Sequence, residues 1–253
     1  MSQHTHSLTD NTVLITGASR RVGACIARTL HAAGANVVIH YNTSTADAKR
    51  IQSELEQIRP HSVKLVQANL ENDQSFTQLI DQAANWHGEL DALINNASTF
   101  YPTPVGQITN DDWNRLMASN LKAPLFLTQA AAPYLKRRKG CVVNIVDIHA
   151  QRPLKQHSLY CVAKAGLAML TQAMALELGP EIRVNGVAPG AILWPEPEPS
   201  EEAKQKVIRR TFLQRHGTPE DIARTVLFLL RDAPYITGEI ITVDGGKSLN
   251  TGI

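Results

Sequence analysis

Tyr160 and Lys164 are the two residues in this sequence whose types and spacing most directly suggest chemistry. They stand four positions apart in a stretch of helical character, so both side chains fall on one face of the predicted helix. An ammonium group beside a phenol favours the phenolate and lowers the pKa of the phenol, which makes tyrosine a usable proton donor near neutral pH. The same spacing is also typical of a solvated helix face, so both interpretations stay open at this point.

A glycine-containing turn, Thr16-Gly17-Ala18-Ser19-Arg20-Arg21-Val22-Gly23, joins the first predicted strand to the first predicted helix. Gly17 permits a tight turn, and Gly23 permits close packing of the helix. Free N–H groups and the positive end of the helix dipole attract phosphate at such a place, and two arginines add fixed charge. We expect the phosphates of a dinucleotide here, although a plain strand–helix connection could carry the same glycines.

The second predicted strand ends in His40-Tyr41-Asn42-Thr43-Ser44, and the first acidic residue after it is Asp47. A carboxylate at the end of this strand usually binds the ribose 2′-hydroxyl of NAD(H). Because a carboxylate would also repel a 2′-phosphate, its absence beside Arg20 favours NADPH. A loop that binds no cofactor would lack the acid as well.

Short apolar runs alternate with longer stretches of helical period along the chain. This alternation indicates crossover units and a parallel sheet covered on both faces, so we predict a single-domain α/β fold with a doubly wound sheet over residues 1–253. Strands are expected at 13–15, 36–40, 63–68, 92–94, 141–146, 183–187 and 239–243, and helices at 21–33, 46–58, 73–86, 111–139 with a bend near Pro124, 158–178 and 220–230.

One break in composition interrupts this alternation, at Trp194-Pro195-Glu196-Pro197-Glu198-Pro199. Alternate prolines exclude a helix or a central strand there. A long loop in a compact domain is often a lid, so we expect a substrate lid at about 191–210. The alternative is a solvated surface insertion. The polar residues 1–10 are expected to form a flexible N-terminus.

Composition and charge exclude several function classes. The chain carries 25 Lys+Arg against 23 Asp+Glu, and this balance gives no basic excess for nucleic acid or an anionic membrane. The basic run Lys136-Arg137-Arg138-Lys139 suits the C-terminal end of a helix. Three separated cysteines and nine scattered histidines form no disulfide framework and no metal-binding pattern. With a polar N-terminus and no long uninterrupted apolar run, we expect a cytoplasmic protein without a metal.

Taken together, the motifs resemble the short-chain dehydrogenase/reductase family over the whole chain. The matching segments are TGASRRVG at 16–23, NNAS at 95–98, Asn120, Tyr160 with Lys164, RVNGVAPG at 183–190 and YITGEIITVDGG at 235–246. The resemblance implies a Rossmann-type sheet of seven parallel strands and a nicotinamide cofactor. It implies that Tyr160 is the acid, that Lys164 holds the nicotinamide ribose and tunes the phenol, and that Asn120 holds a proton-relay water. The implied cofactor-binding residues are Gly17, Arg20, Arg21, Val22, Gly23, His40, Tyr41, Asn42, Asn69, Leu70, Asn96, Ala97, Ser98, Tyr160, Lys164, Pro189 and Gly190.

Two positions depart from the usual family pattern: Arg21 replaces a glycine, and Asp147 replaces a serine. Together with Phe100 in the segment 95–104, they resemble the pteridine reductases, a group that includes bacterial dihydromonapterin reductases. This implies that Phe100 stacks on a pterin opposite the nicotinamide, that Arg21 faces cofactor and pterin, and that Asp147 works with Tyr160 in protonation. Ser98 would also contact the substrate.

The chemistry of a pterin agrees with these departures. Reduction of a C=N bond requires a proton on nitrogen, which a carboxyl group supplies or relays better than a serine hydroxyl does. A phenyl ring offers the flat apolar face that a planar heterocycle needs. The alternatives are a capping or turn role for Asp147 and ordinary core packing for Phe100.

Four other departures bear on substrate range and cofactor affinity. Asn42-Thr43 replaces an arginine found in some pteridine reductases, Ile192 replaces a serine, Asn69 replaces an aspartate, and residues 247–253 lack a near-terminal arginine. We predict an NADPH-dependent enzyme that reduces dihydropterins such as dihydrobiopterin, dihydromonapterin or dihydrofolate. The rivals are a carbonyl or 3-oxoacyl thioester reductase and a non-catalytic NADP(H)-binding regulator.

The family resemblance also implies a homotetramer that packs the helices at about 111–139 and 158–178. Small residues on the second of these helices would allow close helix approach: Ala165, Ala168, Ala173 and Ala175.

Overall fold

The computed structural model describes residues 7–194 and 198–250, which form a seven-stranded sheet in the order β3-β2-β1-β4-β5-β6-β7. Every neighbouring pair of strands in this sheet is parallel. The sequence order reverses direction between β1 and β4, which lie side by side. The strands are β1 (Thr12–Ile15), β2 (Asn36–Tyr41), β3 (Val63–Gln67), β4 (Ala92–Asn95), β5 (Cys141–Ile145), β6 (Arg183–Pro189) and β7 (Ile240–Val243).

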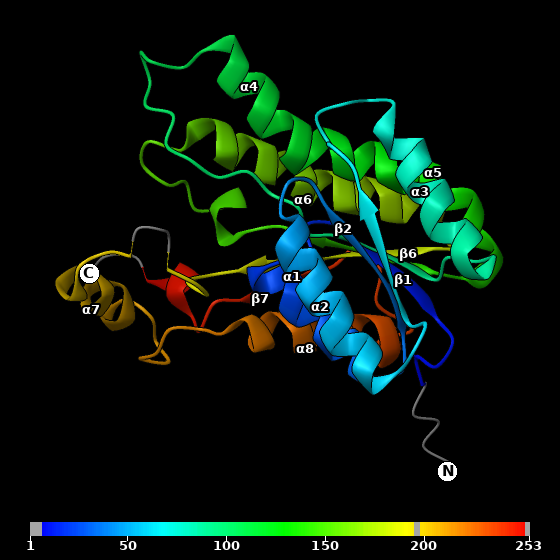
Figure 1. Ribbon diagram of the computed structural model, residues 1–253. Coiled ribbons are helices and arrows are strands. Elements are labelled where there is room, and N and C mark those ends of the chain that lie inside the picture. The colour runs from blue at the N-terminus through cyan, green and yellow to red at the C-terminus, as the bar shows by residue number, and fades with distance from the viewer. Residues whose placement is uncertain (1–6, 195–197, 251–253) are drawn as a thin grey trace.

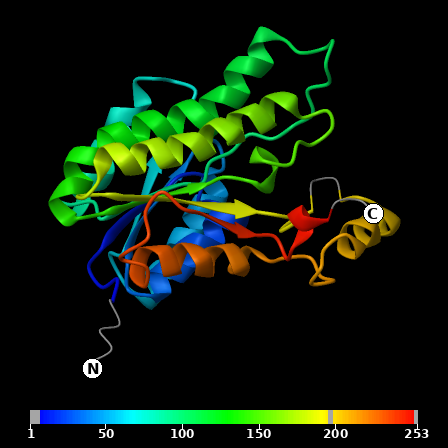
Figure 2. The same ribbon diagram turned by 180° about the vertical axis from the view of Figure 1, so that it is seen from behind.

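Helices cover both faces of the sheet (Figures 1 and 2). One face carries α1 (Arg21–Ala32), α2 (Thr45–Ile58) and α8 (Pro219–Arg231). The other face carries α3 (Ser75–His87), α4 (Asn110–Met117), α5 (Ala123–Arg138) and α6 (Ser158–Leu178). A further helix, α7 (Glu201–Arg209), lies beyond the end of the sheet toward which β6 points (Figure 2). This architecture confirms the predicted doubly wound Rossmann-type α/β fold.

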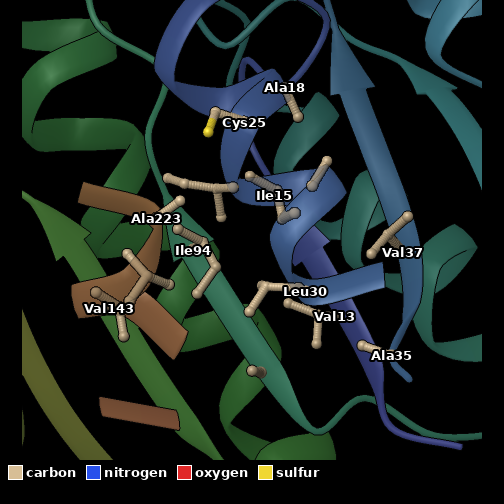
Figure 3. Close-up of a cluster of buried hydrophobic side chains, with 14 of the residues drawn as sticks. Val13, Ile15, Ala18, Cys25, Leu30, Ala35, Val37, Ile94, Val143 and Ala223 are labelled. Carbon is tan, nitrogen blue, oxygen red and sulfur yellow. The ribbon is translucent and has the colours of Figure 1, made fainter. Parts of the chain in front are cut away.

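The core sits on both sides of the sheet because successive residues of a strand point to opposite faces. In β1, Val13 and Ile15 join the cluster beneath α1 and α8, while Leu14 joins the cluster beneath α3 and α5. Figure 3 shows the first cluster, in which Ile94 of β4 lies between Ile15 of β1 and Val143 of β5. Burial on both faces explains why the strands read as almost unbroken apolar runs.

The long helix predicted at 111–139 is interrupted. It is divided into α4 and α5 by a π-helical segment, η1 (Ala118–Lys122), and Pro124 lies in the first turn of α5 directly after it. The interruption therefore begins at Ala118, before the proline at which a bend was expected. The helix ends at Arg138, so the basic run does lie at a helix C-terminus.

The region expected to be a lid contains a helix that the prediction left out. α7 begins after Ser200, whose hydroxyl accepts a hydrogen bond from the N–H of Ala203. Residues 195–197 of the proline repeat, and most of the N-terminus expected to be flexible, lie outside the described residues. Two short 3₁₀ segments, η2 (Ile148–Ala150) and η3 (Lys247–Leu249), were not predicted either.

Among the described residues, one helix is long and apolar enough to span a membrane by length and composition, namely α6. Its apolar residues are instead divided between the core and the surface: Leu167 is buried, whereas Met169 is largely exposed. This helix packs against β6, η2 and α4 within the fold.

Candidate active site

A cavity of about 540 Å³ opens at the carboxyl ends of the strands, where β1 and β4 lie side by side. Crevices at such a switch in strand order are the usual ligand sites of open parallel sheets. Every residue that the family resemblance assigned to the cofactor lines this cavity, and so do Phe100 and Asp147. Asn120 does not line it but contacts Ser98, which does.

The glycine-containing turn fits a phosphate group. Gly17 has a φ of +62°, and a Cβ on Gly23 would lie 2.4 Å from the carbonyl oxygen of Gly17, so both positions require glycine. The first turn of α1 has no acidic residue, and its N-cap residue, Arg20, makes no side-chain cap. Its first N–H groups and the dipole of α1 therefore remain available to an anion in the cavity.

Arg21 adopts a left-handed backbone conformation with a φ of +54°. Non-glycine residues adopt this conformation at an energetic cost, and such residues cluster at functional sites. Arg21 Nη2 donates a hydrogen bond to the carbonyl oxygen of Trp194, 3.0 Å away, so this side chain reaches the first residues of the region expected to be a lid. The ring of Trp194 in turn packs against His216 with centroids 4.1 Å apart.

His40 holds the glycine-containing turn in place through hydrogen bonds to the backbone. Its Nδ1 accepts a hydrogen bond from the N–H of Gly17 at 3.1 Å, and its Nε2 lies 3.1 Å from the carbonyl oxygen of Ala68. Burial lowers the pKa of His40 to about 4, so the imidazole is neutral and Nε2 is the protonated nitrogen. His40 lines the cavity as predicted, but both of its ring nitrogens bind the protein's own backbone.

Arg20 lies on the exposed rim near the end of β2. Its Nε is 3.8 Å from the Asp47 carboxylate, which also forms an ion pair with Arg50. The acidic residue nearest to the strand end is thus paired with two arginines. We infer that it contributes little negative charge to the place where a 2′-phosphate would bind.

Asp147 and Tyr160 form the central polar contact of the site. The Tyr160 hydroxyl donates a hydrogen bond to Asp147 Oδ2 over 2.9 Å. The other carboxylate oxygen, Oδ1, accepts a hydrogen bond from the N–H of His149 at 2.8 Å and caps η2. The two carboxylate oxygens of Asp147 have different contacts. Oδ1 caps a turn, which is the capping interpretation of this residue, and Oδ2 contacts the phenol, as the protonation interpretation requires.

The expectation that Lys164 lowers the pKa of Tyr160 is wrong for this structure. Burial raises the pKa of Tyr160 well above its ordinary value, and the negative charge of Asp147 raises it further. Lys164 Nζ donates its hydrogen bond to the carbonyl oxygen of Ile145 at 2.8 Å and lies 5.7 Å from the centroid of the tyrosine ring. Burial also lowers the pKa of Lys164 to about 8. Tyr160 therefore keeps its proton, as a proton donor must.

Phe100 presents one aromatic face to the cavity. Its ring is 49% exposed and stacks on the imidazole of His157 with centroids 4.6 Å apart. The edge of Tyr160 approaches the same ring at 4.8 Å. His157 does not line the cavity, so its imidazole covers the face of the Phe100 ring that is turned away from the cavity. His157 was not among the predicted site residues. The only signal for it in the sequence was its position three residues before Tyr160.

Asn120 orders the loop that carries Phe100. Its Oδ1 accepts a hydrogen bond from the hydroxyl of Ser98 at 2.7 Å, and its Nδ2 donates to the carbonyl oxygens of Thr99 and Leu116. The residue lies in the π-helical segment η1, and such segments occur frequently at functional sites. The side chain of Asn120 thus fixes the position of residues 98–99. Its role in holding a water stays a prediction.

No group of three or more potential metal ligands occurs among residues 7–194 and 198–250. The polar groups of the site are instead a phenol, a carboxylate, an ammonium and an amide. This set can hold a dinucleotide and transfer a proton.

The sheet order, the glycine-containing turn and the Tyr160–Lys164 pair are those of a nucleotide-dependent oxidoreductase, and the chain belongs to the short-chain dehydrogenase/reductase family. The family model described as enoyl-(acyl carrier protein) reductase matches residues 17–248. Members of this family use NAD(P)H and act on small molecules.

Several characterised relatives cover almost the whole chain. Pteridine reductase 1 of Leishmania tarentolae is 36% identical over an alignment of 288 positions, which covers 97% of this chain and 99% of that protein. L-xylulose reductase of Caenorhabditis elegans is 34% identical over 97% of this chain and 98% of that protein. A 3-oxoacyl-(acyl-carrier-protein) reductase of Staphylococcus aureus is 34% identical over 92% of this chain and 96% of that protein. Because relatives with different activities are similarly identical to this chain, the comparisons establish the family. The substrate has to be inferred from the residues of the site.

Proposed function

We propose that this protein is an NADPH-dependent pteridine reductase that converts dihydropterins to their tetrahydro forms. Dihydrobiopterin, dihydromonapterin and dihydrofolate are the substrates in view. The observation that carries this proposal is the hydrogen bond from Tyr160 to Asp147 beside the open face of Phe100. A carboxylate bound to the proton donor suits a substrate that must gain a proton on nitrogen, and a flat apolar face suits its ring.

The bound nicotinamide would supply the hydride, and the residues of the cavity would hold the cofactor. The N-terminus of α1, with Gly17 and Gly23, binds the phosphates. Arg20 and the strand end at Asn42 receive the 2′-phosphate. Lys164 is buried and held by the carbonyl oxygen of Ile145, so it can hold the nicotinamide ribose from a fixed position.

The protein's own groups would handle the proton. Tyr160 donates it to the ring nitrogen, and Asp147, already hydrogen-bonded to the phenol, restores it. Phe100 positions the pterin, with its outer face packed against His157. Ser98 and Arg21 contact the substrate from the other sides of the cavity.

The principal rival is a carbonyl or 3-oxoacyl thioester reductase, and the Staphylococcus relative supports it. Asp147 speaks against this rival, because a ketone requires only a hydroxyl donor. A non-catalytic NADP(H)-binding regulator has no need of a buried tyrosine acid. A single domain in the cytoplasm, assembled as a homotetramer with a substrate lid at 191–210, completes the proposal.

One assay tests the substrate class. Oxidation of NADPH would be followed with dihydropterins, dihydrofolate, fully oxidised pterins, simple ketones and a 3-oxoacyl thioester. We expect kcat/KM to be highest for a dihydropterin or dihydrofolate. A higher value for the ketone or the thioester would establish the rival.

Cofactor choice is a separate prediction. With Asp47 paired to Arg20 and Arg50 and no acid at the end of β2, NADPH should be preferred over NADH. The preference should reach about ten- to a hundredfold in kcat/KM, which corresponds to ~1.4–3 kcal/mol. Equal kcat/KM values for the two cofactors would refute the assignment of the 2′-phosphate site.

A further inference from the structure

A second cavity of about 330 Å³ lies behind the active site. It is bounded by η2, by α6, and by β7 with the segment that follows it. Val146 and Asp147 line both this cavity and the cofactor cavity, so they form part of the wall between the two. Asp147 is the one of these two residues that can accept or release a proton.

The second cavity suits water. Its lining includes the polar side chains of Gln151, Arg152, Thr242 and Ser248, and Gln151 and Arg152 are exposed at its mouth. Apolar side chains, among them Val146, Ile148 and Ile240, line the rest of the cavity, so its polar partners for water lie on part of its wall. It therefore offers a path from solvent to Asp147 that does not pass through the cofactor cavity.

Charged groups surround this path. Asp244 also lines the second cavity, and its carboxylate accepts hydrogen bonds from the N–H groups of Gly246 and Ser248. Lys247 is half-buried and interacts electrostatically with both Asp147 and Asp244. Lys164 interacts electrostatically with Asp147 as well. Lys164 and Lys247 therefore place two ammonium groups near Asp147.

The cofactor side of the site offers a poorer path. A bound dinucleotide and substrate would fill the first cavity, and the side chain of Asn120 is already bonded to Ser98, Thr99 and Leu116. Lys164 Nζ donates to the carbonyl oxygen of Ile145 and lies 5.7 Å from the centroid of the tyrosine ring. The Tyr160 hydroxyl contacts two side chains, Asp147 and Ser98, and of these two Asp147 is the one that reaches the second cavity.

We propose that the second cavity is the proton entrance of the enzyme and that Asp147 passes protons from it to Tyr160. In each turnover the substrate carbon takes a hydride from NADPH and its nitrogen takes the proton of the Tyr160 hydroxyl, which leaves NADP⁺ and a phenolate. The phenolate takes a proton through the Asp147 carboxyl group, and Asp147 takes one from water in the second cavity. The net reaction consumes one NADPH and one solvent proton for each C=N bond reduced.

This inference rests on the proposed function only in its use of Tyr160 as the acid. It applies equally if the substrate proves to be a ketone. The test can therefore use whichever substrate the panel identifies, so its failure is distinguishable from failure of the pterin proposal.

The test fills the second cavity from two independent directions. Ala168→Phe on α6 and Thr242→Phe on β7 each place a ring in the cavity, and Thr242 is exposed, so its replacement leaves the core intact. Ser53→Phe, at an exposed position of α2 outside the cavity and outside the helices assigned to the interfaces, is the matched control. Thermal melts and NADPH titrations identify any variant that is misfolded.

Rapid mixing then separates the first turnover from steady state. In the filled variants, the first turnover should proceed at the wild-type rate, because Tyr160 already carries its proton. Steady-state kcat should fall about tenfold or more, which produces a burst, and the solvent deuterium isotope effect on kcat should rise. The control should match the wild type. Unchanged kcat and an unchanged isotope effect in both filled variants would overturn the proposal and place proton return in the cofactor cavity.

Discussion

The two carboxylate oxygens of Asp147 contact two different parts of the protein, the 3₁₀ segment η2 and the side chain of Tyr160. Oδ1 accepts the backbone N–H of His149 and shapes η2, while Oδ2 accepts the Tyr160 hydroxyl. A substitution at this position therefore has two effects that can be measured separately. The capping effect changes the stability of the fold, and the loss of a proton carrier changes the rate of the reaction.

Asp147→Asn keeps an oxygen that can accept the N–H of His149 but cannot relay a carboxyl proton. General acid–base assistance is typically worth 10²–10⁴-fold, about 3–5 kcal/mol, so kcat on a dihydropterin should fall by about that factor. NADPH affinity and the melting temperature should change little. Steady-state kinetics and a thermal melt provide both measurements.

Two further substitutions complete this comparison. Asp147→Ser restores the usual family residue and should be equally slow on pterins, with weak reduction of ketones. Asp147→Ala also removes the cap and should lose about 0.5–2 kcal/mol of stability. A near-wild-type kcat in the asparagine variant would mean that Asp147 serves the fold alone.

Phe100→Ala removes the ring face that we assign to the pterin. Stacking is worth roughly 0.5–1.5 kcal/mol beyond burial, so KM for the pterin should rise about two- to tenfold while NADPH affinity stays the same. The control is Phe126→Ala, which removes a partly exposed ring of α5 that stacks on Phe76. A collapse of NADPH affinity in the Phe100 variant would assign that ring to the cofactor.

The candidate site could be predicted from sequence where it depends on local motifs. The glycine turn, Tyr160, Lys164 and Asp147 are identified by their neighbours in the chain. The stacking of His157 on Phe100 could not be predicted, because the two residues lie 57 positions apart and meet through the fold. The direction of the Tyr160 pKa shift was also inaccessible, since burial decides it and burial depends on the packed structure.

At the scale of the elements, α1 approaches β4 and the glycine turn too closely for any side chain at Gly23. A Cβ there would lie 2.5 Å from Nδ2 of Asn96 and 2.9 Å from Cα of Ala18. Gly23→Ala should therefore displace the turn, lower NADPH affinity about tenfold or more and destabilise the fold by about 1–3 kcal/mol. Cofactor titration and chemical denaturation measure the two effects.

Gly88 provides the matched control for this substitution. It ends α3 with a φ of +80°, and nothing lies within 4 Å of the position its Cβ would take. Gly88→Ala should cost about 1 kcal/mol through backbone strain and leave NADPH affinity unchanged. Equal NADPH affinities in the two variants would show that close packing at Gly23 does not shape the cofactor site.

The elements themselves were predictable to different degrees. The strands follow from apolar runs, because a parallel sheet buries both of its faces. The π-helical segment was not predicted, since residues 118–122 continue the helical pattern and the extra residue in the turn responds to packing around Asn120. α7 carries a recognisable start at Ser200, but the neighbouring prolines outweighed that signal in the prediction.

At the scale of the whole molecule, α6 exposes apolar side chains at seven-residue spacing. Val162, Met169 and Leu176 are 54%, 64% and 84% exposed, and together they form a stripe on one side of the helix. Such a stripe indicates a surface that another protein chain covers. We predict that four copies assemble, with α6 in one of the interfaces.

Light scattering during size-exclusion chromatography should give about four times the 27.7 kDa chain mass. Met169→Glu should reduce that mass, because a charge cannot be buried unpaired in an apolar interface. Glu202→Ala, on exposed α7, should leave it unchanged. A monomer at micromolar concentration would refute the assembly.

The hydrogen bond between Gly17 and His40 has a consequence for how the cofactor arrives. Because a buried neutral imidazole fixes the turn in the protein without ligand, the loop is already in one shape before any phosphate reaches it. Little of the binding free energy is then needed to order the loop, and association should proceed in a single step. The free and the cofactor-bound protein should therefore share one loop conformation, so that the cofactor meets a rigid receptor.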